Sequence, residues 1–394
     1  MATQRIGLIG TGDQARSYGA HIAANPRQFT FAAVASKSQD RMNSYADEFG
    51  VPAGARYANT EALVDSGVPL DGLIITSPDT THEEVALASM KLRVPILLEK
   101  PIADSVEGAY RVARAAESAG VDITVGLVLR YTPFYSKIKE LIEDGAIGRL
   151  TQIDGRLVLK YTFASTHFMR SHNRHRSDMG SFALSMCGHD FDIINWYVGD
   201  RATHIASFGG LDYFLPRDDA AMRCSECDRA PICPFYGPHA FADRPPSPYT
   251  DHCVYHIDKD IVDSQHFMIE YANGVRVSFS ALFLGHRTRR ELLIVGDEGE
   301  IRADLDRNEI EVDRFRPQQS WRFDLKAASS GPLGIPGLMD DLRNRIAGIE
   351  GESTATAEAG RESVVVGIGG DEAQRERRIV DLDGLRAKGA AAAA

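Results

Sequence analysis

The sequence predicts a two-domain α/β protein, in which an N-terminal parallel sheet with crossover helices precedes an α+β domain with a mostly antiparallel sheet. From residue 4 to about residue 128, short apolar runs alternate with helical patterns, as in successive βαβ units. After Val128, apolar and polar residues alternate, which is typical of strands with one solvent-facing side. The length of 394 residues also suits two domains. We expect these domains at residues 1–128 and 129–387, followed by a tail at 388–394 that takes no part in the fold.

Composition limits the class of protein. Hydrophobic residues make up 43% of the chain and charged residues 25%, so a sizeable core can form. The net charge of -11 and the lack of a long basic run argue against nucleic acid or an anionic membrane as a partner. No apolar stretch is long enough to span a bilayer, and the N-terminus leads directly into an expected strand. We therefore expect a cytoplasmic protein with reduced cysteines.

The first domain is expected to contain strands at 5–9, 29–35, 72–76, 95–98 and 123–128. Helical patterns lie between them at 14–24, 39–49, 81–92 and 106–119. Each helix is long enough to return the chain to the same end of the sheet, so the strands run parallel. Their carboxyl ends then meet at one edge, which is where such sheets bind ligands.

The second domain is expected to open with a helix at 134–143, because Phe134, Ile138, Leu141 and Ile142 share one helical face. Alternating strands follow at 152–159, 266–271, 275–281 and 291–295, with a hairpin turn at Asn273-Gly274. A late helix is expected at 357–373. The stretch 211–256 is rich in Pro, Asp and Cys and shows no period, so we expect a functional or pinned loop.

A glycine-rich turn lies between the first strand and the first helix: Gly10-Thr11-Gly12-Asp13-Gln14-Ala15. It matches the G-x-G-x-x-G/A pattern of dinucleotide-binding turns in the context that the pattern requires. The first glycine permits the tight turn, the second lets the backbone approach a pyrophosphate, and the small third residue allows helix–strand packing. The expected cofactor is NAD(H) or NADP(H), with its phosphates at the helix N-terminus.

The second strand leads into Ser36 and Lys37, where NAD-binding sites usually place a carboxylate that holds the ribose 2′-hydroxyl. Serine does not repel a 2′-phosphate and lysine attracts one, so the pair favours NADP(H). The alternative role of Lys37 is that of a solvated surface lysine.

A second motif, Leu98-Glu99-Lys100-Pro101, ends a later apolar run at the ligand-binding edge of the same sheet. A lysine there can exchange a proton with substrate; the alternative is a surface lysine that caps the strand. Together with the glycine turn, the motif resembles the Gfo/Idh/MocA oxidoreductase family, named after glucose–fructose oxidoreductase and inositol dehydrogenase. The resemblance covers residues 5–385 and implies a Rossmann domain, an α+β domain with an open sheet, a catalytic Lys100, and Glu99 near the cofactor.

The same resemblance places more residues at the site. Ser77-Pro78-Asp79-Thr80-Thr81-His82 is similar to the family's P-N-x-x-H loop near the cofactor, which puts Ser77 and His82 there. His189 matches the family's catalytic histidine, and Asp192 matches the aspartate three residues later. Asp192 either orients the imidazole or makes a structural helix contact.

Two departures from the family pattern concern the general base. Most family members resemble D-x-x-x-H at this point, and this chain has Ser185 in place of the aspartate. A subgroup with a Cys-rich loop, which this chain resembles more closely, has a lysine where this chain has Met186. Either His189 acts with Lys100 alone, or the chain has lost ordinary dehydrogenase activity.

Polar residues of the second domain predict a substrate pocket formed by Arg130, Tyr131, His167, Arg170, Arg174 and Asp192. Guanidinium groups bind carboxylate, sulfonate or phosphate in a fork, so the pocket suits a hydroxylated ligand, neutral or anionic. The alternative for residues 161–176 is a solvated basic loop. The resembling subgroup has arginines at positions 170 and 174, which ranks these two first.

Four cysteines of the long loop form a C-x-x-C pair and two further thiols: Cys224, Cys227, Cys233 and Cys253. Such a set can make a tetrahedral structural zinc site, although the spacing is not that of a standard finger. Buried free thiols are the alternative.

These observations favour hydride transfer between a nicotinamide and a ring hydroxyl of a sugar, sugar derivative or cyclitol, with Lys100 and His189 relaying the hydroxyl proton. One alternative is an NAD-dependent glycoside hydrolase that works by transient oxidation, elimination, hydration and re-reduction. A second is a sugar-sensing regulator with a degenerate site, which Ser185 and Met186 would suit. An open sheet leaves one face exposed, so we also expect a homodimer or homotetramer.

Overall fold

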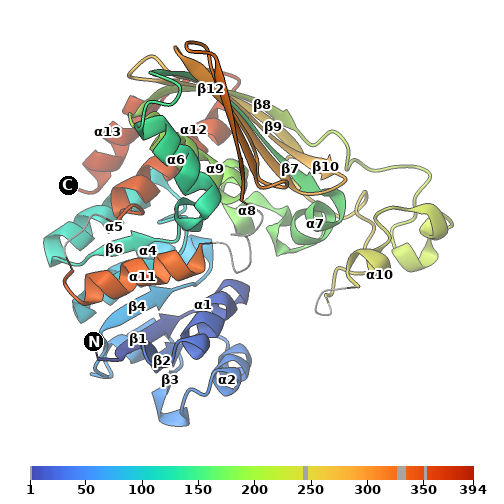
Figure 1. Ribbon diagram of the computed structural model, residues 1–394. Coiled ribbons are helices and arrows are strands. Elements are labelled where there is room, and N and C mark those ends of the chain that lie inside the picture. Colours follow the sequence, from blue (N-terminus) through green and yellow to red (C-terminus); the bar gives the residue numbers. More distant parts are fainter. Residues whose placement is uncertain (1, 243–246, 326–333, 350–352) are drawn as a thin grey trace.

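The computed structural model describes residues 2–242, 247–325, 334–349 and 353–394. Its first domain is built on a parallel sheet, the blue part of Figure 1. The strands lie in the order β3 (Arg56–Tyr57), β2 (Phe29–Ala35), β1 (Gln4–Ile9), β4 (Gly72–Ile75), β5 (Ile96–Leu98) and β6 (Ile123–Val125). The reversal of order between β1 and β4 creates the crevice in which such sheets bind dinucleotides.

The crossover helices of this domain are α1 (Asp13–Ala24), α2 (Gln39–Glu48), α3 (Thr60–Val64), α4 (His82–Ser89) and α5 (Val106–Ala119). The predicted parallel βαβ arrangement is confirmed. The sequence pattern missed β3 and α3, because elements of two and five residues are too short to show a period. The predicted strand at 123–128 ends early, because a 3₁₀ turn begins at Val128.

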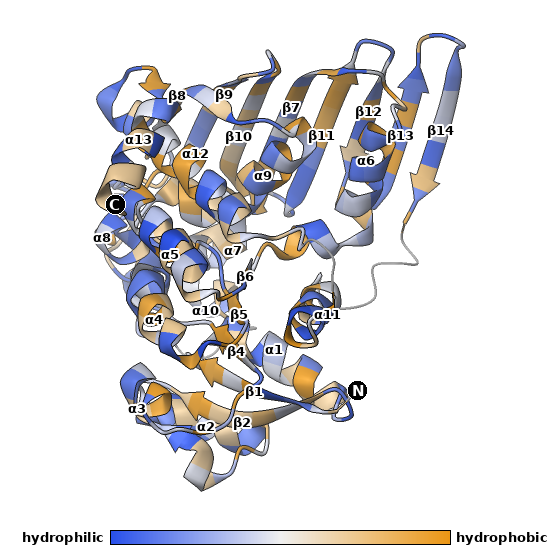
Figure 2. Cartoon of the chain, turned by 90° about the vertical axis from the view of Figure 1, so that its left-hand side faces the viewer, coloured by the Kyte–Doolittle hydropathy of each residue, from blue (hydrophilic) through white to orange (hydrophobic). Residues whose placement is uncertain are grey.

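The second domain is built on a mixed sheet that is mostly antiparallel, as predicted, although β7 and β10 pair in parallel. Figure 2 shows its strands side by side across the top of the molecule. They lie in the order β14 (Gln319–Asp324), β13 (Glu309–Arg314), β12 (Gly299–Asp304), β11 (Arg289–Gly296), β7 (Leu150–Lys160), β10 (Arg276–Gly285), β9 (Ser264–Tyr271), β8 (Ala202–Gly210) and β15 (Val380–Asp381). The Asn273-Gly274 hairpin joins β9 to β10, as expected.

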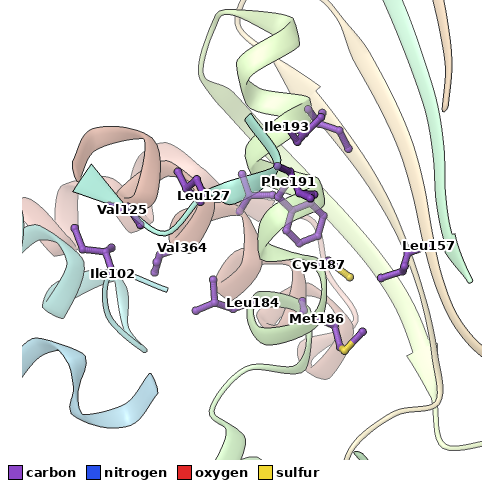
Figure 3. Packing of buried hydrophobic residues seen from close by; sticks show 14 of the residues in the cluster. Ile102, Val125, Leu127, Leu157, Leu184, Met186, Cys187, Phe191, Ile193 and Val364 are labelled. Carbon is purple, nitrogen blue, oxygen red and sulfur yellow. The ribbon is translucent and has the colours of Figure 1, made fainter. Parts of the chain in front are cut away.

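Helices cover the inner face of this sheet. They are α6 (Pro133–Glu143), α7 (Tyr161–Ala164), α8 (Arg176–Met179), α9 (Phe182–Val198), α12 (Ala357–Glu376) and α13 (Leu382–Ala392). In Figure 3, α9 carries Phe191 and Cys187 on the side of Leu157 of β7, and Leu184 on the side of Val364 of α12. The close approach of α12 needs a glycine, because a Cβ on Gly367 would lie 2.9 Å from the Cα of Leu184. This packing fixes α9 between the sheet and α12.

Two C-terminal helices differ from the expected organisation. The helix α11 (Ile335–Ile346) follows the second sheet but packs on the first, where Leu338 and Met339 join the core around Leu8. The chain thus returns to the first domain after residue 334. The expected tail is also wrong, since α13 continues to Ala392 and Gly389 packs against Tyr110 of α5. Burial against α5 keeps these residues helical.

The long stretch 211–256 forms an arm that carries α10 (Gly237–Ala240) and projects on the right of Figure 1; its residues 243–246 lie outside the described structure. The start of the arm is pinned by Asp263, whose carboxylate accepts hydrogen bonds from the backbone N–H groups of Tyr213 and Phe214. Among the helices that the structure describes, none has the length and apolar character needed to cross a membrane.

Candidate active site

The glycine turn between β1 and α1 has the geometry of a dinucleotide cradle. Gly10 has a φ of 93°, and an added Cβ would lie 2.5 Å from the carbonyl oxygen of Thr76, so only glycine fits. A Cβ on Gly12 would meet no atom within 4 Å, and in the part of the chain described here no side chain caps the start of α1. The Ser77 hydroxyl is buried there without a partner among these residues. Open backbone N–H groups and an orphaned hydroxyl fit a bound pyrophosphate.

The end of β2 presents two hydroxyl groups and a lysine. Thr11 Oγ1 lies 3.1 Å from Ser36 Oγ, which also accepts a 3.4 Å hydrogen bond from the Ser38 backbone N–H. Lys37 is exposed, and so is Asp13. The predicted cofactor residues at this edge therefore lie together with the glycine turn.

Glu99 connects the glycine turn to the lysine motif. Its Oε1 accepts hydrogen bonds from the Tyr18 hydroxyl at 2.5 Å and from Gln14 Nε2 at 2.9 Å, and its Oε2 accepts one from the Lys100 backbone N–H at 3.0 Å. Burial raises the pKa of the Glu99 carboxyl, and the hydrogen bond from Tyr18 opposes that rise. Tyr18 was missed in the sequence; its buried position one turn into α1 was the available signal.

Lys100 reaches from the end of β5 to α9 of the second domain. Its Nζ donates a 3.2 Å hydrogen bond to the backbone carbonyl of Ser185, one helical turn before His189. Burial, the Lys100 ammonium and the Arg290 guanidinium lower the pKa of His189 well below its usual value. The His189 ring is therefore neutral, and its Nδ1 is buried with no hydrogen-bond partner in the described ranges. The structure thus brings the two predicted catalytic residues to one place.

His82 holds the two loops that end β4 and β5. Its Nδ1 lies 2.6 Å from the carbonyl oxygen of Pro101, and its Nε2 lies 2.8 Å from that of Ser77. The side chain is fully buried. His82 therefore fixes the loop after Lys100 rather than presenting a ring to a ligand.

Arg130 and Asp192 form a buried ion pair. Arg130 donates to Asp192 through Nε at 2.9 Å and through a terminal nitrogen at 2.7 Å, and it also donates to the Thr354 carbonyl. Its guanidinium lies over the Trp196 ring, 5.2 Å from the centroid. Asp192 is only 1% exposed, and its hydrogen bonds go to Arg130 instead of His189. Of the two roles considered for Asp192, the structure supports the helix contact.

A second buried pair lies on the next turn of α9 and was missed in the sequence. Arg290 of β11 donates a 2.8 Å hydrogen bond from Nε to Asp190 Oδ1. The other oxygen of Asp190 is buried and has no partner within the described structure. An arginine on the sheet face that also carries the buried Ile294 was the available signal.

The two arginines ranked first as substrate ligands lie elsewhere. Arg170 has no exposed surface, and it contacts the cysteine arm through the His252 carbonyl at 3.4 Å and Cys224 Sγ at 4.0 Å. Its guanidinium also lies over the Phe241 ring. Arg174 lies over the Tyr249 ring of the same arm, 4.8 Å from the centroid. The hypothesis of a fork that meets substrate is wrong for Arg170, because burial beneath the arm occupies its guanidinium.

The remaining predicted pocket residues have internal partners. The Tyr131 hydroxyl donates a 2.5 Å hydrogen bond to Asp341 of α11, and the His167 ring stacks on Phe163 with centroids 4.8 Å apart. These contacts join Tyr131 to the helix that returns to the first domain.

The four arm cysteines line one small cavity, and all four thiols are free. Within residues 2–242, 247–325, 334–349 and 353–394, no three His, Cys, Asp or Glu side chains are arranged to hold a metal. The structure therefore does not support the zinc site that the spacing suggested. Packing of Phe235 and Tyr255 into the same cavity spaces the thiols instead.

The family comparison agrees with this geometry. Residues 4–127 match the model described as "Oxidoreductase family, NAD-binding Rossmann fold", and residues 135–302 match the GFO/IDH/MocA C-terminal domain. A cradle for a dinucleotide and a lysine at the sheet edge are what such a domain requires.

Individual relatives are more distant. The chain is 26% identical to YteT of Bacillus subtilis (strain 168), over 80% of this chain and 82% of that protein. It is 30% identical to inositol 2-dehydrogenase 2 of Saccharopolyspora erythraea, over 50% of this chain and 55% of that protein. A structure of levoglucosan dehydrogenase with NADH and levoglucosan has the same fold, with a TM-score of 0.75, 19% identity, and coverage of 96% of this chain and 99% of that one. The chain belongs to the Gfo/Idh/MocA family of oxidoreductases, and its N-terminal domain is the NAD-binding Rossmann fold of that family.

Proposed function

We propose that this oxidoreductase transfers a hydride between a nicotinamide and a ring hydroxyl of a sugar or cyclitol. One observation carries the proposal: the Lys100 ammonium is hydrogen-bonded to α9 one turn before a neutral His189, beside the glycine turn. The relatives named above include dehydrogenases of an inositol and of levoglucosan, which are both polyhydroxylated rings. The site is thus suited to a secondary alcohol whose hydroxyl proton must leave as the hydride leaves carbon.

The residues of this chain divide that task. A bound nicotinamide would supply the hydride acceptor. The neutral imidazole of His189 accepts the hydroxyl proton, and Lys100 donates a hydrogen bond to the same oxygen and stabilises its developing negative charge. Glu99 holds the Lys100 backbone in place. We further propose that NADP(H) is accepted, since Ser36 and Lys37 stand where a carboxylate would repel a 2′-phosphate.

A substrate screen with two readouts tests the proposal. Neutral sugars, uronates, inositols and aryl glycosides are incubated with NAD⁺ or NADP⁺, and reduced cofactor and released phenol are recorded in parallel. Formation of reduced cofactor in proportion to substrate consumed is the expected result. Release of phenol without net reduction would instead establish redox-cycling glycoside hydrolysis, and neither signal across the screen would contradict both.

We also propose that the outer face of the second sheet associates with a second copy of the chain. This face exposes Phe208 of β8 and Met268 of β9, with 72% and 67% of their surfaces accessible. Apolar side chains on neighbouring strands are more easily kept in water when a partner covers them. Light scattering should give twice or four times the chain mass of 43.2 kDa, and Phe208→Glu should reduce it.

A further inference from the structure

We infer that Arg290 is a positioning residue that keeps His189 in its neutral, proton-accepting form. The inference rests on the proposed function and assigns a role to a side chain from the second sheet. Arg290 lies on β11, and its Nε is anchored at 2.8 Å to Asp190, the residue next to His189 on α9. The guanidinium is thereby fixed against the turn that carries the imidazole.

The geometry of the anchor matters. Arg290 makes one hydrogen bond to Asp190 rather than a bidentate pair, and the second Asp190 oxygen has no partner in the described part of the chain. A single contact leaves the charge on the guanidinium less fully compensated than a fork–fork pair would. A positive charge held close to a buried imidazole disfavours the imidazolium. Arg290 therefore protects the proton-accepting form of His189.

Few other ionisable groups face this turn. Lys100 approaches from the end of β5 and adds a second positive charge at Ser185. From α12, Asp371 bonds to the Ala183 backbone N–H at the start of α9, while α6 contributes Tyr135 and α9 itself contributes Cys187. The two cations act on His189 in the same direction as its burial.

Substitution of Arg290 tests the role. The experiment uses the full chain labelled with ¹⁵N-histidine, and the His189 signals are identified from their loss in a His189→Gln variant. The imidazole titration of Arg290→Met is compared with that of wild type, of Arg290→Lys and of Arg302→Met. Arg302 is a matched control, because it lies on β12 of the same sheet and forms exposed ion pairs with Glu300 and Asp313.

We expect Arg290→Met to raise the titration midpoint of His189, while Arg290→Lys and Arg302→Met leave it near that of wild type. In turnover assays, kcat/KM of Arg290→Met at about pH 5 should fall about three- to tenfold relative to its value at about pH 8. An unchanged midpoint in a folded Arg290→Met protein would overturn the inference; should that variant not fold, Arg290→Gln takes its place. Because the titration needs no substrate, a protein that oxidises no polyol would contradict the proposed function and leave this test intact.

Discussion

The Nζ of Lys100 lies 3.2 Å from the backbone carbonyl oxygen of Ser185, a contact between residues 85 positions apart. Lys100 belongs to the dinucleotide-binding domain, and Ser185 belongs to the helix that carries His189. The hydrogen bond therefore joins the two halves of the catalytic pair across the domain boundary. Because it is made to a main-chain atom, it does not depend on the side chain at position 185.

Loss of the Lys100 ammonium should abolish most of the activity. Lys100→Met keeps the apolar stem and removes the charge, so turnover should fall by about two to four orders of magnitude, the usual contribution of acid–base catalysis. Cofactor binding, measured by fluorescence titration with NADH, should change little. Lys37→Met, at an exposed lysine of the same domain, is the control. Near-normal turnover in Lys100→Met would remove this residue from the mechanism.

A carboxylate at the end of β2 should change cofactor preference. Ser36→Asp places a negative charge where the 2′-phosphate of NADP would lie and offers an acceptor to the 2′-hydroxyl of NAD. The ratio of kcat/KM for NAD⁺ over NADP⁺ should rise about ten- to a hundredfold, as expected for one charge-assisted contact. If wild type already rejects NADP⁺, the role assigned to Ser36 and Lys37 is wrong.

Glu99 should make stability depend on pH. Its carboxyl has a folded-state pKa raised by burial, so the folded state retains a proton that the unfolded chain has lost. Its contribution to stability is then complete below the ordinary carboxyl range and falls as pH rises through the folded pKa. In Glu99→Gln, melting temperatures measured from about pH 4 to pH 8 should show less of this decline than wild type. Parallel curves for the two proteins would contradict the prediction.

The Arg130–Asp192 pair should matter for folding more than for substrate binding. Asp192→Asn leaves a guanidinium without its counter-charge in a site where Asp192 is 1% exposed. Denaturant unfolding should show a loss of about 3–5 kcal/mol. Asp383→Asn, which breaks the half-exposed pair with Arg201, is the control and should cost far less. A substrate KM that rises sharply in a fully stable Asp192→Asn protein would restore this residue to the pocket.

Arg170 should not determine substrate charge preference. Its guanidinium is buried beneath the cysteine arm, where a substrate carboxylate does not reach it. Arg170→Met should therefore change the kcat/KM ratio for a uronate over its neutral sugar by less than about twofold, because no contact with the substrate is lost. A selective loss of activity on the uronate would show that the arm opens during binding.

Local patterns were sufficient to predict much of this protein. The glycine turn, the βαβ alternation and the placement of Lys100 after a buried strand each depend on neighbours within a few residues, so a single sequence displays them. The hairpin at Asn273-Gly274 follows from backbone freedom at one position, where Gly274 has a φ of 85°. His189 required the family resemblance, because one histidine in an apolar helix carries no signal of catalysis.

Partner choice was decided only in three dimensions. Arg170, Arg174 and Arg290 are similar in sequence, yet the first two lie against aromatic rings of the arm and the third against Asp190. A guanidinium at the end of a long stem can satisfy its charge in several ways, and packing of distant segments selects one. The return of α11 to the first sheet has the same cause, since its apolar face is complementary to a surface formed about 300 residues earlier.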